Sequence, residues 1–300
     1  MGYYKRITNA FENALRLPLS PCTKYVLLSD CHRGNGTNND NFLKNQNLYF
    51  AALDYYFKKG FCYIELGDGD ELWENRSFSQ ITEIHSNTFW LLSRFYDQNR
   101  FYSLYGNHDM CKKDAVFCTK KCCHYYCDST DCHVPLFPQI SFPESIILEN
   151  CTGGPNLYLT HGHQADMLNS TFWKLSRFLV RYVWRHLEGI GFLDPTSAAK
   201  NYTWKKKTEK RLSQWCKQEQ RILIAGHTHR PSLPLPGAIP YCNTGSCVHP
   251  RCITAIEIEH MALSLVKWTY ETRFDYTLIM GREVLAGPVN IAEYAKSFNS

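Results

Sequence analysis

Five short polar motifs in this chain of 300 residues each follow an apolar, strand-like run. They lie at residues 30–32, 67–71, 106–109, 161–163 and 226–229. Together they offer Asp, Asn and His side chains in proportions that suit two neighbouring divalent cations. Such a mixed set favours manganese, with iron, zinc or nickel as alternatives, over the all-oxygen shells that calcium and magnesium prefer. Two such cations can clamp a phosphate and activate water as hydroxide, so the motifs predict metal-dependent hydrolysis of a phosphate ester or pyrophosphate.

The spacing within the motifs supports a shared site. Asp30 and His32 alternate along an extended segment, as do His227 and His229, so each pair can face one side. Asp68 follows a buried run and precedes an acidic cluster, which makes it the candidate to bridge two metals. Taken alone, an Asp after a strand is more often a helix N-cap, and a lone His is more often a core residue. Five motifs in one order favour the metal site.

The elements that must position these residues follow from the pattern of apolar residues. Strands are expected at 25–28, 61–66, 101–105, 145–148, 157–160 and 222–225, and a hairpin at 254–258 with 262–268. Helices are expected at 1–20, 41–58 and 78–98, and over most of 169–220. The alternation predicts an α/β fold in which the motifs gather at the carboxyl ends of strands, where sites in such sheets form.

Composition sets broad limits on the protein. Lys and Arg total 33 against 28 for Asp and Glu, a mildly basic balance that fits a phosphate-bearing substrate without giving a strong nucleic-acid signal. No apolar run approaches the ~18 residues that cross a bilayer, and residues 1–18 lack the apolar core of a signal peptide. We expect a cytoplasmic protein, with peripheral contact to the inner face of a membrane as one alternative.

The chain has 14 cysteines, and the segment 111–133 is the richest in them. We expect this segment to form a Cys-rich loop insert in a single domain spanning 1–300. Six of the cysteines lie there together with His124 and His133. One interpretation is an accessory zinc site, and the other is a surface loop with free thiols. The irregular spacing of the cysteines favours the free thiols.

A basic, aromatic stretch at 171–187 forms part of a predicted helical cap insert at 165–220. Lys174, Arg177, Arg181 and Arg185 recur at helical spacing. They form either the solvated face of an amphipathic helix or a lid that contacts a phosphate-bearing, lipid-linked substrate or an anionic membrane surface. Arg177 and Arg181, together with Arg33 next to His32, are therefore candidate substrate residues. For Arg33 the alternative is an exposed charge in a loop.

The five motifs resemble the pattern of the calcineurin-like metallophosphoesterase superfamily, D-x-H, G-D-x-x-[DE], G-N-H-[DE], a His-Gly motif and G-H-T-H. Every element of that pattern is present in order between Asp30 and His229. The resemblance implies a four-layer α/β/β/α sandwich of two mixed sheets, here with the helical cap insert. The insert also resembles, in its position, the helical cap of UDP-diacylglucosamine pyrophosphatases.

The resemblance also implies the roles of individual residues. The first metal would be bound by Asp30, His32, Asp68 and His229, and the second by Asp68, Asn107, His161 and His227. His108 would contact the scissile phosphate, with Asp109 orienting it, while Glu71 would support the loop. The alternatives within the superfamily are a nucleotide-lipid pyrophosphatase and a nuclease or cyclic-nucleotide diesterase. A scaffold that binds metal without catalysis is the alternative outside it.

Overall fold

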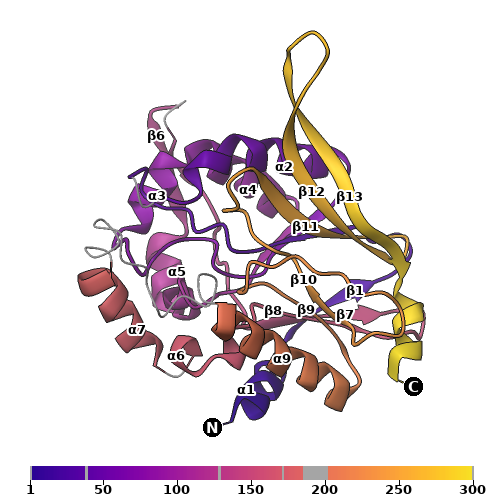
Figure 1. Cartoon of the computed structure of the whole chain (residues 1–300). Helices are drawn as coiled ribbons and strands as arrows, with labels where there is room; N and C mark the ends of the chain where they lie inside the picture. Colours follow the sequence, from indigo (N-terminus) through magenta and orange to yellow (C-terminus); the bar gives the residue numbers. More distant parts are fainter. Residues whose placement is uncertain (1, 38–39, 128–129, 171, 185–201, 299–300) are drawn as a thin grey trace.

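The chain folds into two mixed β-sheets packed face to face, with helices on their outer faces (Figure 1). The computed structural model describes residues 2–37, 40–127, 130–170, 172–184 and 202–298. One sheet has five strands and the other six. The predicted α/β class with two mixed sheets is confirmed.

The five-stranded sheet has the order β1-β7-β8-β9-β10. Its strands are β1 (Leu15–Leu19), β7 (Ser145–Asn150), β8 (Leu157–Thr160), β9 (Ile222–Ala225) and β10 (Tyr241–Asn243). Strands β8, β9 and β10 run parallel, and β7 is antiparallel to β8. The carboxyl ends of β8 and β9 therefore meet at one edge of this sheet.

The six-stranded sheet has the order β13-β12-β11-β2-β3-β4. Its strands are β2 (Tyr25–Leu28), β3 (Cys62–Glu65), β4 (Phe101–Ser103), β11 (Cys252–Glu259), β12 (Ala262–Thr272) and β13 (Leu278–Asn290). Strands β2, β3 and β4 are parallel neighbours, whereas β11, β12 and β13 are antiparallel. The distal part of the β12–β13 hairpin projects beyond the rest of the molecule (Figure 1).

Three apolar clusters hold these layers together. One lies between the sheets and contains Leu27 and Ile64 from one sheet and Leu159 and Ile224 from the other. A second joins the six-stranded sheet to α2 (Gln46–Lys58) and α4 (Ser86–Asp97). A third joins the five-stranded sheet to α1 (Tyr3–Ala10) and α9 (Tyr202–Glu219), where Trp215 is fully buried. Because apolar surface is buried on both faces of each sheet, the sheets are held in fixed positions relative to each other, and so are the ends of their strands.

Two expected helices differ in the structure, and one long strand was not expected. The helix expected at 1–20 ends at Ala10, and Leu15–Leu19 forms an edge strand that pairs with β7. The helix expected at 78–98 divides into α3 (Phe78–Ile84) and α4, because His85 leaves helical geometry with φ −105° and ψ 32°. Its ring instead contacts Asp40 at 2.9 Å. The strand β13 was not expected.

The Cys-rich segment is more ordered than a surface loop. It holds η2 (Met110–Lys113), α5 (Ala115–Lys121) and the hairpin of β5 (His124–Cys127) with β6 (Cys132–Pro135). Cys118, Cys122 and Cys127 are buried in the apolar cluster under the six-stranded sheet, and none of the 14 cysteines, all of which are described, forms a disulfide. Among the described residues, no candidate metal group includes a cysteine.

The segment predicted as a helical cap begins with η3 (His163–Ala165), α6 (Met167–Ser170), α7 (Trp173–Leu179) and the π-helical turn η4 (Val180–Trp184). Residues 171 and 185–201, which include Arg185 and the end of the predicted basic helix, lie outside the described residues. Helix α9 completes the segment and packs on the five-stranded sheet. The other described helical turns are η1 (Leu43–Asn45) and η5 (Ile291–Phe298). None of the described helices combines the length and apolar content needed to cross a bilayer.

Candidate metal centre

The predicted ligand residues lie on loops that leave parallel strands of both sheets. Asp30, Asp68 and Asn107 follow β2, β3 and β4, whereas His161 and His227 follow β8 and β9. Because parallel strands end at one edge, each sheet delivers its loops to the same region. The loops are also joined directly, since Asp30 N–H donates to the Gly67 carbonyl at 3.1 Å and Gly226 N–H to the His161 carbonyl at 2.9 Å.

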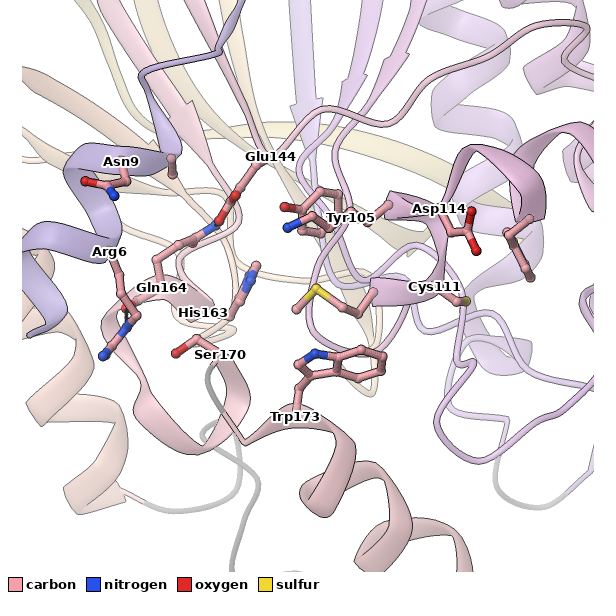
Figure 2. A pocket seen from close by; sticks show the side chains of 14 residues that line it. Arg6, Asn9, Tyr105, Cys111, Asp114, Glu144, His163, Gln164, Ser170 and Trp173 are labelled. Carbon is pink, nitrogen blue, oxygen red and sulfur yellow. Dashed lines mark hydrogen bonds between the residues drawn. The ribbon is translucent and has the colours of Figure 1, made fainter. Parts of the chain in front are cut away.

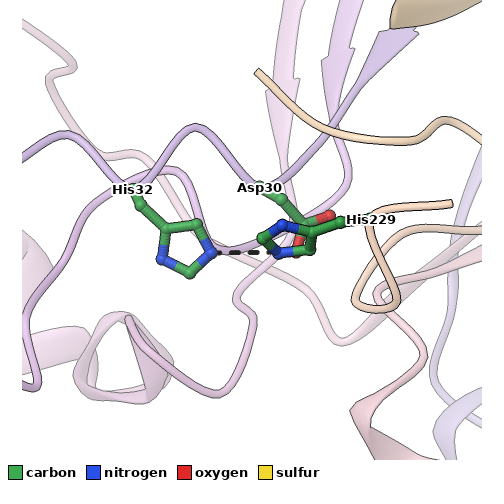
Figure 3. Close-up of side chains that lie close together, drawn as sticks. All are labelled: Asp30, His32 and His229. Atoms are coloured by element: carbon green, nitrogen blue, oxygen red, sulfur yellow. Dashed lines mark ion pairs between the residues drawn. The ribbon is translucent and has the colours of Figure 1, made fainter. Parts of the chain in front are cut away.

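Asp30, His32 and His229 form the first of two ligand groups (Figure 3). Asp30 Oδ1 lies 3.0 Å from His229 Nε2 and 3.9 Å from His32 Nε2. The carboxylate is fully buried, and its other oxygen accepts the His227 backbone N–H at 2.9 Å. Fixing one oxygen by the backbone leaves Oδ1 directed at the two imidazoles.

Asp68, His161 and His227 form the second group. Asp68 Oδ2 lies 3.1 Å from His161 Nε2, which in turn lies 3.2 Å from Asn107 Oδ1. His161 is fully buried, and its Nδ1 lies 2.8 Å from the Leu66 carbonyl. The Leu66 carbonyl can accept a hydrogen bond from Nδ1–H, and in the neutral ring this leaves the lone pair on Nε2, the atom that would bind a metal.

Asp68 lies between the two groups. Its Oδ2 is 3.1 Å from His161 Nε2 in the second group and 3.9 Å from His32 Nε2 in the first. Its Oδ1 accepts the His108 backbone N–H at 2.8 Å. Burial opposes ionisation of Asp68, but the His161 and His108 imidazoles outweigh it and hold the pKa of this carboxyl well below its ordinary value. Asp68 thus has the position expected of a carboxylate shared by two metals.

The backbone at the ligands is unusual. Five of the seven predicted ligands are non-glycine residues with a left-handed φ, namely Asp30 (53°), His32 (48°), Asp68 (51°), His227 (66°) and His229 (54°). Such residues are uncommon and cluster at functional sites. Gly106 allows the loops to approach, because a Cβ there would lie 2.1 Å from Asp68 Oδ1.

Glu71 orients two imidazoles from outside the centre. Its carboxylate lies 3.0 Å from His32 Nδ1 and 2.7 Å from His108 Nδ1. His32, Glu71 and His108 also lie close enough together to hold a metal ion. Their nearest atoms, however, are already hydrogen-bonded to one another, because the Nδ1 atoms of both rings contact the Glu71 carboxylate. Glu71 therefore holds the Nδ1 side of both rings and leaves the Nε2 atom of each ring unengaged by it, while its Oε1 also accepts the Trp73 N–H of the loop at 3.2 Å.

His108 is held by Glu71 and Trp73 rather than by Asp109. The Trp73 and His108 rings stack with centroids 4.4 Å apart. Burial opposes the charged imidazole, but the carboxylates of Glu71 and Asp68 outweigh it and raise the pKa of His108 to about 10 in the metal-free protein. The expectation that Asp109 orients His108 is wrong, because the Asp109 carboxylate is engaged by the Gly106 N–H at 2.6 Å and by Lys112 at 2.6 Å.

A buried network of charges lies behind these loops. Lys112 pairs with Asp109 and, at 2.7 Å, with Asp70. Arg33 donates to Asp70 at 2.8 Å and to both Glu65 oxygens at 2.8 and 3.0 Å. Arg33 is only 1% exposed, so it is neither the exposed loop charge nor the substrate contact that the sequence suggested. Its guanidinium ties two motif loops to β3 instead.

The two other candidate substrate residues lie on α7 and η4. Arg181 donates to the carbonyls of Leu72 at 2.8 Å and Trp73 at 2.7 Å. It therefore fixes the loop that carries Trp73, whose ring stacks on His108. The Arg177 guanidinium lies 4.9 Å from the centre of the Trp173 ring. A substrate role for these arginines stays a prediction.

Sequence reasoning missed Trp73 and Lys112. Trp73 is two residues beyond Glu71, and Lys112 is three beyond Asp109, a spacing that brings side chains together in a helical turn. Neither is part of the motif pattern, so only the packing of the loops identifies them.

No family model and no curated protein matches the chain. Among solved structures, Vps29 of Chaetomium thermophilum aligns over 89% of this chain and 97% of its own, with a TM-score of 0.39 and 9% identical residues. At that level of similarity, the likeness supports no inference about the site.

Proposed function

We propose that this protein is a metal-dependent phosphoric ester hydrolase with two divalent cations at the Asp68 centre, as the resemblance to the calcineurin-like metallophosphoesterases implies. The observation that carries the proposal is the convergence of the two ligand groups on Asp68 Oδ2. The first site would use Asp30, His32, Asp68 and His229. The second would use Asp68, Asn107, His161 and His227.

The residues fit such cations in two respects. His32 Nε2 and His227 Nε2 are buried without a hydrogen-bond partner, and each is an atom that would bind metal. A buried polar atom without a partner costs about 1–3 kcal/mol, so a bound ion would offset a penalty that the fold already carries. The donors are imidazole, carboxylate and amide, which suit manganese and its neighbours.

The bound cations and the side chain of His108 would have different roles in the reaction. Bound cations would polarise phosphoryl oxygens and lower the pKa of a nearby water. His108 would then donate a hydrogen bond from Nε2 to a phosphoryl or leaving-group oxygen, because Glu71 occupies Nδ1 and Trp73 fixes the plane of the ring. Such preorganised donors stabilise charge that develops in the transition state.

The test is metal analysis combined with hydrolysis assays. Metal-free protein is reloaded with manganese, iron, zinc or nickel and assayed with p-nitrophenyl phosphate, bis(p-nitrophenyl) phosphate and a nucleoside diphosphate ester. We expect two metals per chain and metal-dependent turnover of at least one substrate. The His227→Ala variant should lose metal and activity, whereas the control His260→Ala, at an exposed turn, should keep both.

Two outcomes would count against the proposal. Two bound metals without turnover in any metal form would favour the non-catalytic scaffold. Turnover that survives both chelation and His227→Ala would place the reaction elsewhere in the molecule.

A further inference from the structure

A cavity of about 640 Å³ lies beside the candidate metal centre, between α1, the segment 105–117 and the segment 163–173 (Figure 2). Its volume is in the range of small-molecule sites. None of the seven candidate metal ligands lines it. The cavity is therefore a separate feature, adjacent to the centre through His163, whose ring centre is 5.5 Å from that of His161.

His163 gives the first sign that the cavity accepts a ligand. The residue is 2% exposed, and its Nδ1 is buried without a hydrogen-bond partner. Figure 2 shows the ring directed from one wall towards the space that Trp173 closes on another side. A buried imidazole nitrogen with no partner is costly, so a polar atom of a bound molecule would complete the wall.

The charges at the wall define the ligand further. The two carboxylates are engaged: Asp114 accepts the Val116 N–H at 2.8 Å, and Glu144 accepts from Gln164 at 3.1 Å. Lys113, in contrast, has no carboxylate partner among the described residues, and its ammonium lies 5.8 Å from the centre of the Tyr105 ring. Both carboxylates already accept hydrogen bonds, whereas the Lys113 ammonium has no acceptor among the described residues, so an anionic group of a ligand would supply one.

The rest of the wall is apolar and aromatic. Tyr105, Met110, Phe117 and Trp173 surround the polar groups. Flat aromatic walls favour a planar or apolar body and would contribute most of the buried area. A bare inorganic anion would leave these surfaces uncovered.

We propose that this cavity is a binding site for an organic anion with an aromatic or apolar body, whose charged group is held by Lys113 and whose polar atom reaches His163. The site is distinct from the metal centre and does not depend on the proposed hydrolase activity.

The experiment is titration calorimetry on the full chain in metal-free and metal-loaded forms. The probes are indole-3-acetate and phenylacetate, with neutral indole and inorganic phosphate as matched compounds that lack the charge or the body. We expect saturable binding of the aryl carboxylates in both forms, and at least about tenfold weaker binding of indole and phosphate. Lys113→Ala should weaken indole-3-acetate binding about tenfold or more, and Trp173→Ala should weaken it as well.

The control is Lys120→Ala, which removes an exposed lysine of α5 that does not line the cavity. It should leave the affinity unchanged. Asp68→Ala should also bind indole-3-acetate normally, which separates this site from the metal centre. Loss of binding in Asp68→Ala, full competition by phosphate, equal affinity in Lys113→Ala, or no saturable binding at millimolar concentration would each overturn the proposal.

Discussion

Replacing Lys112 with methionine removes the only cation that contacts Asp109 among the described residues. Lys112 is 2% exposed, and its ammonium lies 2.6 Å from Asp109 and 2.7 Å from Asp70. Asp70 keeps Arg33, but Asp109 keeps only the Gly106 N–H. Removing one partner of a buried ion pair costs about 3–5 kcal/mol, because the remaining charge stays buried.

That free energy converts to a measurable shift in melting temperature. An unfolding entropy of roughly 2.1 cal/mol/K per residue over 300 residues gives about 0.6 kcal/mol/K, so Lys112→Met should lower Tm by about 5–8 °C. Calorimetry or denaturant unfolding monitored by circular dichroism measures the loss. Lys58→Met is the matched control, since the Lys58–Asp54 pair is exposed and should contribute less than about 0.5 kcal/mol.

A double variant tests the cause. Adding Asp109→Asn to Lys112→Met removes the uncompensated charge and should recover at least about 1 kcal/mol. A loss in Lys112→Met no larger than in Lys58→Met would refute the argument from burial. A large loss that Asp109→Asn does not relieve would show that packing of the lysine chain, not its charge, matters.

Three other substitutions test the loops. Glu71→Gln should lower kcat by about 10²-fold with metal content retained, since the amide keeps the shape but not the charge that orients the two imidazoles; an unchanged kcat with full metal content would contradict this role. Gly106→Ala should reduce metal stoichiometry and activity together, because the added Cβ would lie 2.1 Å from the Asp68 carboxylate, and normal metal binding would refute the close approach. Burial opposes ionisation of Asp40, but the His85 hydrogen bond outweighs it and lowers the pKa of this carboxyl. Its contribution to stability is therefore present above the ordinary Asp value of about 3.9 and lost as pH falls below it, so urea midpoints of wild type and Asp40→Asn should converge at low pH.

The sequence predicted the strands that carry the site better than the helices around it. The runs at 25–28, 157–160 and 222–225 have the same bounds as β2, β8 and β9, because each is a short apolar segment ended by a polar motif. The first 20 residues were harder, since Leu15–Leu19 alternates buried and exposed positions only because it pairs with β7, over 100 residues away. The alternation of Leu with Arg16 and Pro18 over five residues is too short to identify a strand without its distant partner.

The site residues show the same division. The resemblance of the motifs to the superfamily pattern implied the seven candidate ligands, and the structure brings them to one region. The roles of the charged neighbours could not be predicted from the sequence. Arg33 and Asp109 each carry a charge that could act on a substrate or form a buried ion pair. Only the three-dimensional neighbours decide between these uses, and here both residues are held in the network around Lys112.

The strain and the unpaired atoms of the centre have one explanation in common. A left-handed φ at five candidate ligands and two buried imidazole nitrogens without partners both destabilise the metal-free fold. Neither feature improves packing. The left-handed backbone orients the ligand side chains towards the space around Asp68, and the unpaired atoms lie on those side chains. The surrounding contacts, which include the Glu71 carboxylate, the Leu66 carbonyl and the Lys112 network, hold that arrangement in place. A fold keeps such destabilising features where a bound ligand offsets their cost in free energy. The geometry therefore favours a metal centre over a merely polar core.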